Sequence, residues 1–182
     1  MKHEIFDKTL KIIDTDITFE QIYDKKYIPK EYLEDIKKAN LLIIPNEGFR
    51  DTGDVLFPET TREFLDFIRD SSGDNVVADI AISDEDFQRI ELHSAAIEVA
   101  TIIVESAIFN IAIGIISAFL YDLIKKYHRT PEETSAKVKI VTKETKTKKS
   151  KMITYEGPVS GVKDALDQAA KDLFSEGQKN DD

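Results

Sequence analysis

The sequence predicts an α/β fold, α+β in strict terms, organised around a small sheet. Two short apolar runs, Leu41–Ile44 and Val76–Ile82, flank a segment with helical spacing, which is the pattern of a βαβ unit with parallel strands. A long uncharged stretch at the centre of the chain predicts a buried apolar helical segment. The last third alternates apolar and polar residues before helical spacing returns, which predicts a β-hairpin followed by an amphipathic helix.

The chain length limits the number of domains. With 182 residues, 41% of them apolar, the chain is long enough to bury a core and is expected to form one compact domain. Residues 1–38 are expected to be a partly helical lead-in, because Pro29 can begin a helix in which Tyr32, Leu33 and Ile36 repeat at helical spacing.

Residues 39–84 are expected to form the βαβ unit. The first strand, Leu41–Ile44, is ended by Pro45, and its unbroken apolar character indicates a strand covered on both faces. Pro58 begins the helix, and residues 71–74 end it before the second strand. The apolar stripe of that helix is made by Phe64, Leu65, Phe67 and Ile68.

Residues 85–128 are expected to be helical, as two helices or one kinked helix. Acidic residues at 84–86 favour a helix start, because carboxylates stabilise the N-terminal end of the helix dipole. Polar residues then recur at intervals of four, three and four in two separate stripes, which do not align on one straight helix. The first stripe is Ser94, Glu98, Thr101 and Glu105, and the second is Asn110, Gly114, Ser117 and Tyr121.

Residues 129–182 are expected to form the hairpin and the last helix. Val138, Ile140 and Thr142 alternate with Lys139, Val141 and Lys143, which predicts a strand, and Met152–Tyr155 is extended again. The amphipathic helix carries its apolar residues at helical spacing, and the tail from Ser175 has no apolar residue and is expected to fray. The helix stripe is Val162, Ala165, Leu166, Ala169, Leu173 and Phe174.

The uncharged run from Ser106 to Tyr121 has two explanations, a membrane span and a buried core. Its hydropathy lies in the range of membrane spans, and Ser106, Asn110, Gly114 and Ala118 repeat the small-residue spacing of packed membrane helices. However, the run covers about 24 Å of helix, short of the roughly 30 Å hydrocarbon core. Lysines after it would also require the acidic N-terminal part to be translocated, and no signal segment is visible. We therefore expect a soluble core, with a membrane anchor as the alternative.

The charge and cysteine content bear on location and partners. The chain carries a net charge of −10, which disfavours nucleic acid and anionic lipid, and it has no cysteine, which favours a reducing compartment such as the cytoplasm. One tract from Lys137 to Lys151 holds seven lysines and a single acid, Glu144. A solvated hairpin tip accounts for these lysines, since nucleic-acid sites usually add arginine and aromatic residues. We expect no specific nucleic-acid binding.

The best candidate for a ligand site is the loop 46–54, which leaves the carboxyl end of the first βαβ strand, where open α/β sheets bind ligands. Gly48 allows unusual backbone angles, Arg50 suits a phosphate or carboxylate, and Asp51 and Asp54 suit a hydroxyl. A surface loop in which Arg50 pairs with Asp51 or Asp54 is nevertheless the preferred interpretation. The loop contains no nucleotide-binding fingerprint.

Other reactive patterns are weak. Glu98 and Glu105 are predicted on one helix face, where paired carboxylates could act as acid and base, but a solvated stripe is the preferred interpretation. His93 has no metal-ligand spacing to Glu98, and His128 stands at a helix end, where a cation suits the dipole. We expect no metal site, no cofactor and no catalytic residue, with an enzyme that uses the loop 46–54 as the alternative.

These observations lead to three hypotheses. The first is a non-catalytic interaction or regulatory module that oligomerises or binds a larger protein through its apolar helices, with Ile108, Ile111, Ile115 and Phe119 at the interface. The second is a binder of a small anionic ligand, or an enzyme, that uses the loop 46–54. The third is a membrane-attached component held by residues 106–121.

Overall fold

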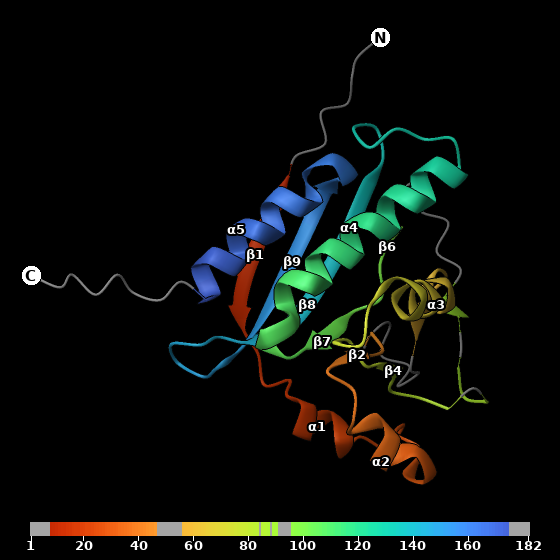
Figure 1. Cartoon of the computed structure of the whole chain (residues 1–182), viewed down its shortest axis with the longest axis vertical. Coiled ribbons are helices and arrows are strands. Elements are labelled where there is room, and N and C mark those ends of the chain that lie inside the picture. The colour runs from red at the N-terminus through yellow and green to blue at the C-terminus, as the bar shows by residue number, and fades with distance from the viewer. Residues whose placement is uncertain (1–7, 47–55, 84, 88, 91–95, 175–182) are drawn as a thin grey trace, which may run out of the picture.

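In the computed structural model, residues 8–46, 56–83, 85–87, 89–90 and 96–174 are described. They form a mixed seven-stranded sheet and five α-helices, which confirms the predicted α/β class (Figure 1). The strand order is β1-β9-β8-β7-β2-β4, and β6 pairs with β8 beside this path. The strands are β1 (Thr9–Asp14), β2 (Leu41–Ile43), β4 (Ala78–Ile80), β6 (Ile97–Glu98), β7 (Ile102–Val104), β8 (Ser135–Lys143) and β9 (Ser150–Pro158).

The helices lie on both faces of the sheet. The longer helices α3 (Thr61–Ser71), α4 (Phe109–Lys126) and α5 (Val162–Phe174) form one layer, with α4 between α3 and α5 (Figure 1). The short helices α1 (Phe19–Tyr23) and α2 (Leu33–Ile36) contribute to a second, smaller core on the opposite face. A separate pair of short parallel strands joins β3 (Phe57–Pro58) to β5 (Arg89–Ile90).

Alternation along the strands divides the core between these faces. Leu41 and Ile43 of β2 face the layer of α3, α4 and α5, whereas Leu42 packs with residues of α1 and α2. Because successive side chains of a strand point to opposite faces, an apolar strand such as β2 needs cover on both sides.

The predicted βαβ unit is confirmed. β2 and β4 are parallel, with Leu41 opposite Ala78, and α3 connects them. The predicted C-terminal hairpin and helix are also confirmed: β8 and β9 pair antiparallel, with Ile140 opposite Ile153, and α5 follows.

The helical prediction for residues 85–128 is wrong in its first part. The structure places strands β5, β6 and β7 before Val104, and α4 begins only at Phe109, after a 3₁₀ turn at Ser106–Ile108. Residues 97–104 are rich in β-branched side chains, which fit a pleated, buried surface better than a helix. β7 pairs with both β2 and β8, so this segment joins the two halves of the sheet.

The lead-in 1–38 also differs from its prediction. It contains the short helices α1 and α2, but its described part also contains the unpredicted strand β1, which pairs antiparallel with β9. β1 alternates between half-buried Leu10 and Ile12 and exposed neighbours, as expected of a strand with one face on the core.

Candidate functional site

The predicted ligand residues Gly48, Arg50, Asp51 and Asp54 lie outside the described residues, so the loop 46–54 stays a prediction. Asn46, its first residue, is described and lies beyond the carboxyl end of β2.

Asn46 organises a small polar network beside Glu98. Its Nδ2 donates to a Glu98 carboxylate oxygen at 3.1 Å, and its Oδ1 accepts from the Thr101 hydroxyl at 3.1 Å. The predicted placement of Glu98 and Glu105 on one helix face is wrong, because Glu98 lies in β6 and Glu105 follows β7. Glu98 therefore has a hydrogen-bond partner in Asn46 and shares no helix face with Glu105.

The predicted interface residues fall into two groups. Ile108, Ile115 and Phe119 are buried in the chain's own core, with at most 7% of each exposed. Ile111 is 41% exposed. On this fold, Ile111 is the member of the set whose side chain a partner can reach.

The exposed side of α4 forms a surface that we call the α4 outer face. Gly114 lies in its middle, and a Cβ atom built there would meet no atom within 4 Å. Tyr121, near its C-terminal end, is 44% exposed. This face carries no charge over four turns of helix. It consists of Ala107, Ile111, Gly114, Ala118 and Tyr121, with exposed Asn110 and half-buried Ser117 as uncharged polar neighbours.

The neighbouring helices differ from α4 in their exposed residues. On α3 every exposed side chain except Ser71 is charged, and the same is true of most of those on α5. All three helices bury an apolar side against the same sheet, so their outer sides are directly comparable. The charged side chains of α3 are Arg62, Glu63, Asp66, Arg69 and Asp70, and those of α5 are Lys163, Asp164, Lys171 and Asp172.

A groove of about 580 Å³ adjoins the C-terminal end of the α4 outer face. Phe67 of α3 forms one wall, and Lys125 and Arg129 supply positive charge beside Asp122. The Phe67 ring lies 5.4 Å from the ring of Phe119 underneath, so this wall is fixed to the core. The groove combines an apolar floor with a basic rim.

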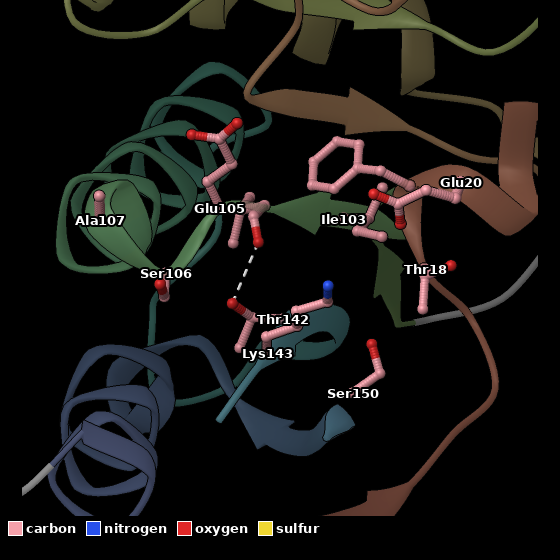
Figure 2. A pocket seen from close by; sticks show the side chains of 11 residues that line it. Thr18, Glu20, Ile103, Glu105, Ser106, Ala107, Thr142, Lys143 and Ser150 are labelled. Atoms are coloured by element: carbon pink, nitrogen blue, oxygen red, sulfur yellow. Dashed lines mark hydrogen bonds between the residues drawn. The ribbon is translucent and has the colours of Figure 1, made fainter. Parts of the chain in front are cut away.

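A second concavity, of about 320 Å³, lies where the sheet meets α1 and the start of α4. Figure 2 shows Glu20, Lys143 and Ser150 around this pocket, with Glu105 on the side of α4. The Thr142 hydroxyl in its wall donates to the Val104 carbonyl at 3.0 Å. We call it the β7–β8 pocket.

The chain matches no family model, no curated protein and no solved structure.

Two acids and one lysine line the β7–β8 pocket. Within the described part of the chain, Glu20, Glu105 and Lys143 form no ion pair. Burial raises the pKa of Tyr23, and the Glu20 and Glu105 carboxylates raise it further, so both acids act on one phenol. A molecule carrying an ammonium near the two acids and a carboxylate near Lys143 fits this charge pattern.

Among the described residues, one helix, Ser106–Lys126, has the length and composition of a membrane span. About 61% of its most apolar window is buried within the chain. The inward half of the apolar run is therefore explained by packing on the sheet, as in the core helices of many proteins. The outward half is the α4 outer face, which this packing does not explain.

Proposed function

We propose that this chain is a non-catalytic interaction module that receives a helix of another protein on the α4 outer face. One observation carries the proposal: a helix in the middle of a surface layer exposes an uncharged side while both neighbours expose charged ones. The proposed module needs no cofactor and acts in the cytoplasm.

The α4 outer face exposes apolar side chains to water, which is unfavourable. Exposed helix positions in soluble domains normally carry charged or polar side chains, and a contiguous apolar strip indicates a surface that another molecule covers. Ile111 and Tyr121 supply large apolar side chains, and Gly114 and Ala118 between them leave the backbone open to close approach. A second helix can pack its ridges into such a notch.

The chemistry of the partner follows from the groove beside Tyr121. Lys125 and Arg129 make its rim basic, although the whole chain is acidic. A partner helix with an apolar stripe and acidic residues near one end would satisfy both parts of the surface. The proposed partner is therefore an amphipathic helix with an acidic end.

Site-specific photocrosslinking in the native cells tests this proposal. A photoreactive residue at Ile111 is expected to give an adduct of discrete mass, and Ala118→Glu introduced into the same chain is expected to remove it. The matched control places the probe at Val77, which is 47% exposed but lies away from α4. Ala118 is exposed, so Ala118→Glu should leave the melting temperature nearly unchanged.

The mass of the adduct decides the class of partner. An adduct of the chain with a different protein supports the proposal. An adduct with twice the chain mass would assign the face to a second copy, and adducts with lipid would assign it to a membrane. Equal crosslinking at positions 111 and 77 would mean that the α4 outer face is not an interface.

A second candidate function is the binding of a small zwitterion, such as an amino acid, in the β7–β8 pocket. The specific observation is that Glu20, Glu105 and Lys143 surround one concavity without neutralising one another in the described structure. Titration calorimetry with single amino acids should detect binding that Lys143→Met abolishes and that Lys139→Met leaves unchanged. Equal heats for the two variants would exclude this pocket.

A further inference from the structure

The two edges of the main sheet differ in how their backbone groups are satisfied. At the β4 edge, Arg69 donates to the Ala78 carbonyl at 3.3 Å, and the Asp79 carboxylate accepts from the Ile80 N–H at 2.8 Å. Arg69 and Asp79 are also an ion pair, at 3.7 Å. Side chains thus occupy the backbone groups that another strand would need, which is a known protection of edge strands.

Among the described residues, no side chain bonds the outer backbone groups of β1 in this way. The Thr15 N–H donates to the Ser150 carbonyl at 3.1 Å, and Thr15 continues the register in which Ile13 lies opposite Met152. In an antiparallel ladder, alternate residues bond to the partner strand. The backbone N–H and C=O of Ile13 therefore bond to β9, whereas those of Ile12 point away from β9, toward the open edge. By the same alternation, the backbone groups of Leu10 and Asp14 also point toward the open edge. Within the described residues, no hydrogen bond from these three backbone N–H groups is found.

The charges around β1 are complementary to those of a second copy that runs antiparallel to it. In the stretch from Lys8 to Asp16, KTLKIIDTD, the first half carries the lysines and the second half carries the aspartates. If two copies run antiparallel with Ile12 opposite Ile12 of the other copy, Lys8 lies opposite Asp16, and Thr9 lies opposite Thr15. Lys8 and Asp16 are both exposed and form no ion pair within the described chain.

We propose that two copies of this chain pair through their β1 strands, antiparallel about Ile12, and so join two sheets into one. The charge pattern selects this register, and the ladder phase is compatible with it. The backbone groups of Ile12 point toward the open edge, so Ile12 of each copy can form the central hydrogen-bonded pair. The next hydrogen-bonded pairs place Leu10 of one copy opposite Asp14 of the other. The pairing adds about six backbone hydrogen bonds between the copies.

Neighbouring registers are less favourable. Moving the centre to Asp14 places two aspartates opposite each other, and like charges directly opposite destabilise a sheet. Moving it to Leu10 separates Lys8 from Asp16. A centre at Lys11 would place two lysines opposite each other in a non-hydrogen-bonded pair, and a centre at Ile13 would separate Lys8 from Asp16.

The second copy would also cover apolar surface. Leu10 and Ile12 are only half-buried against the core below α5, and Ile13 on the other face is 55% exposed. Continuing the sheet past β1 brings a neighbouring strand, and the helix layer above it, alongside these side chains. This contact uses none of the α4 outer face, so it does not depend on the interaction proposed there.

Charge exchange provides the test. Light scattering on a sizing column should give the unaltered chain twice its 20.7 kDa. Lys8→Asp and Asp16→Lys each place like charges opposite, and each is expected to raise the dimer dissociation constant roughly tenfold or more. Combining the two substitutions restores opposite charges and should restore the dimer. Lys26→Asp, at an exposed lysine away from β1, is the control for the change in net charge.

Amide hydrogen exchange provides a second measurement. The Ile12 amide should be protected in the unaltered chain and exposed to exchange in Asp16→Lys, while the Ile13 amide, bonded to β9, stays protected in both. A monomer at every concentration would overturn the proposal. A dimer that both single variants leave intact would overturn it too, because the contact would then lie on another surface.

Discussion

The phenol of Tyr155 fills the space next to Gly161. A Cβ atom on Gly161 would lie 2.7 Å from the Tyr155 hydroxyl oxygen, closer than nonbonded atoms approach. The hydroxyl cannot easily move, because Tyr155 is fully buried and donates a 2.7 Å hydrogen bond to the Pro158 carbonyl. The end of β9 and the start of α5 are therefore fitted around one oxygen atom.

Gly161→Ala is expected to lower the free energy of unfolding by about 1–3 kcal/mol, because the added methyl group overpacks this space. Tyr155→Phe removes the oxygen, and the next atom near the new Cβ would be Lys8 Cδ at an ordinary 3.5 Å. In that background, Gly161→Ala should cost little. Urea unfolding of the four chains of this double-mutant cycle measures the coupling.

Gly157→Ala is the contrasting variant in the same experiment. Gly157 has a φ of 155°, and its Cβ would also approach backbone, at 3.1 Å from Lys8 Cα. Tyr155→Phe should therefore fail to rescue it. Equal rescue at both glycines would show that the hydroxyl oxygen is not the specific obstacle.

Tyr155 also makes stability fall at high pH. Burial raises the pKa of Tyr155 from 10.0 to about 12. The folded chain thus keeps a proton that the unfolded chain releases above pH 10, so the contribution is constant below pH 10 and is lost as pH rises toward 12. The loss attributable to Tyr155 is roughly 2 kcal/mol. Unfolding midpoints from pH 9 to 12 should fall more steeply for the unaltered chain than for Tyr155→Phe.

Phe119 and Ile111 lie on the same helix, but truncating each to alanine is expected to change the free energy of unfolding by different amounts. Phe119 is buried between the rings of Phe64, at 4.9 Å, and Phe67, at 5.4 Å. Phe119→Ala should cost about 3–5 kcal/mol, or roughly 10 °C in melting temperature. Ile111→Ala should cost less than about 1 kcal/mol, because its side chain is already 41% exposed. Similar losses for the two variants in a calorimetric scan would contradict the placement of α4.

The Asp79 carboxylate is expected to control exchange at the β4 edge. Asp79→Ala removes the acceptor of the Ile80 N–H and should speed exchange of that amide by roughly tenfold or more. The Ala81 N–H donates to the Ile43 carbonyl at 2.9 Å and serves as an internal control. Faster exchange at both amides would indicate that the whole strand has loosened.

Local sequence patterns were sufficient to predict the elements whose structure does not depend on distant strand partners. Leu41–Ile44 carries the unbroken apolar run of a doubly covered strand, and α5 carries an apolar stripe at helical spacing, so both were predictable. The βαβ connection followed because its strands and helix are adjacent in sequence.

The segment 97–104 was mispredicted because two patterns compete there. Glu98, Thr101 and Glu105 have helical spacing, but Ile102, Ile103 and Val104 are β-branched and apolar in succession. The structure resolves the competition through β2 and β8, two distant strands that both need a neighbour. Such pairing is not visible in a local window, although the β-branched density was a usable signal.

The candidate surfaces show the same limit. Sequence reasoning identified the uncharged run of α4 but could not separate its buried side from its exposed side, so it chose Ile115 and Phe119 with Ile111. The β7–β8 pocket was also out of reach, because Glu20, Glu105 and Lys143 come from distant segments that only the sheet brings together.

The pairing of β1 with β9 has a consequence for the newly made chain. Lys151 contacts Asp14 at a sequence separation of 137 residues, so the first strand meets its neighbour only when most of the chain has been synthesised. At a translation rate of roughly 5–20 residues per second, that wait is on the order of 10 s. Contacts this distant in sequence slow folding, and during the wait Leu10–Ile13 is available to chaperones. A ribosome that stalls before residue 150 would therefore hold a nascent chain whose N-terminal strand has no native partner.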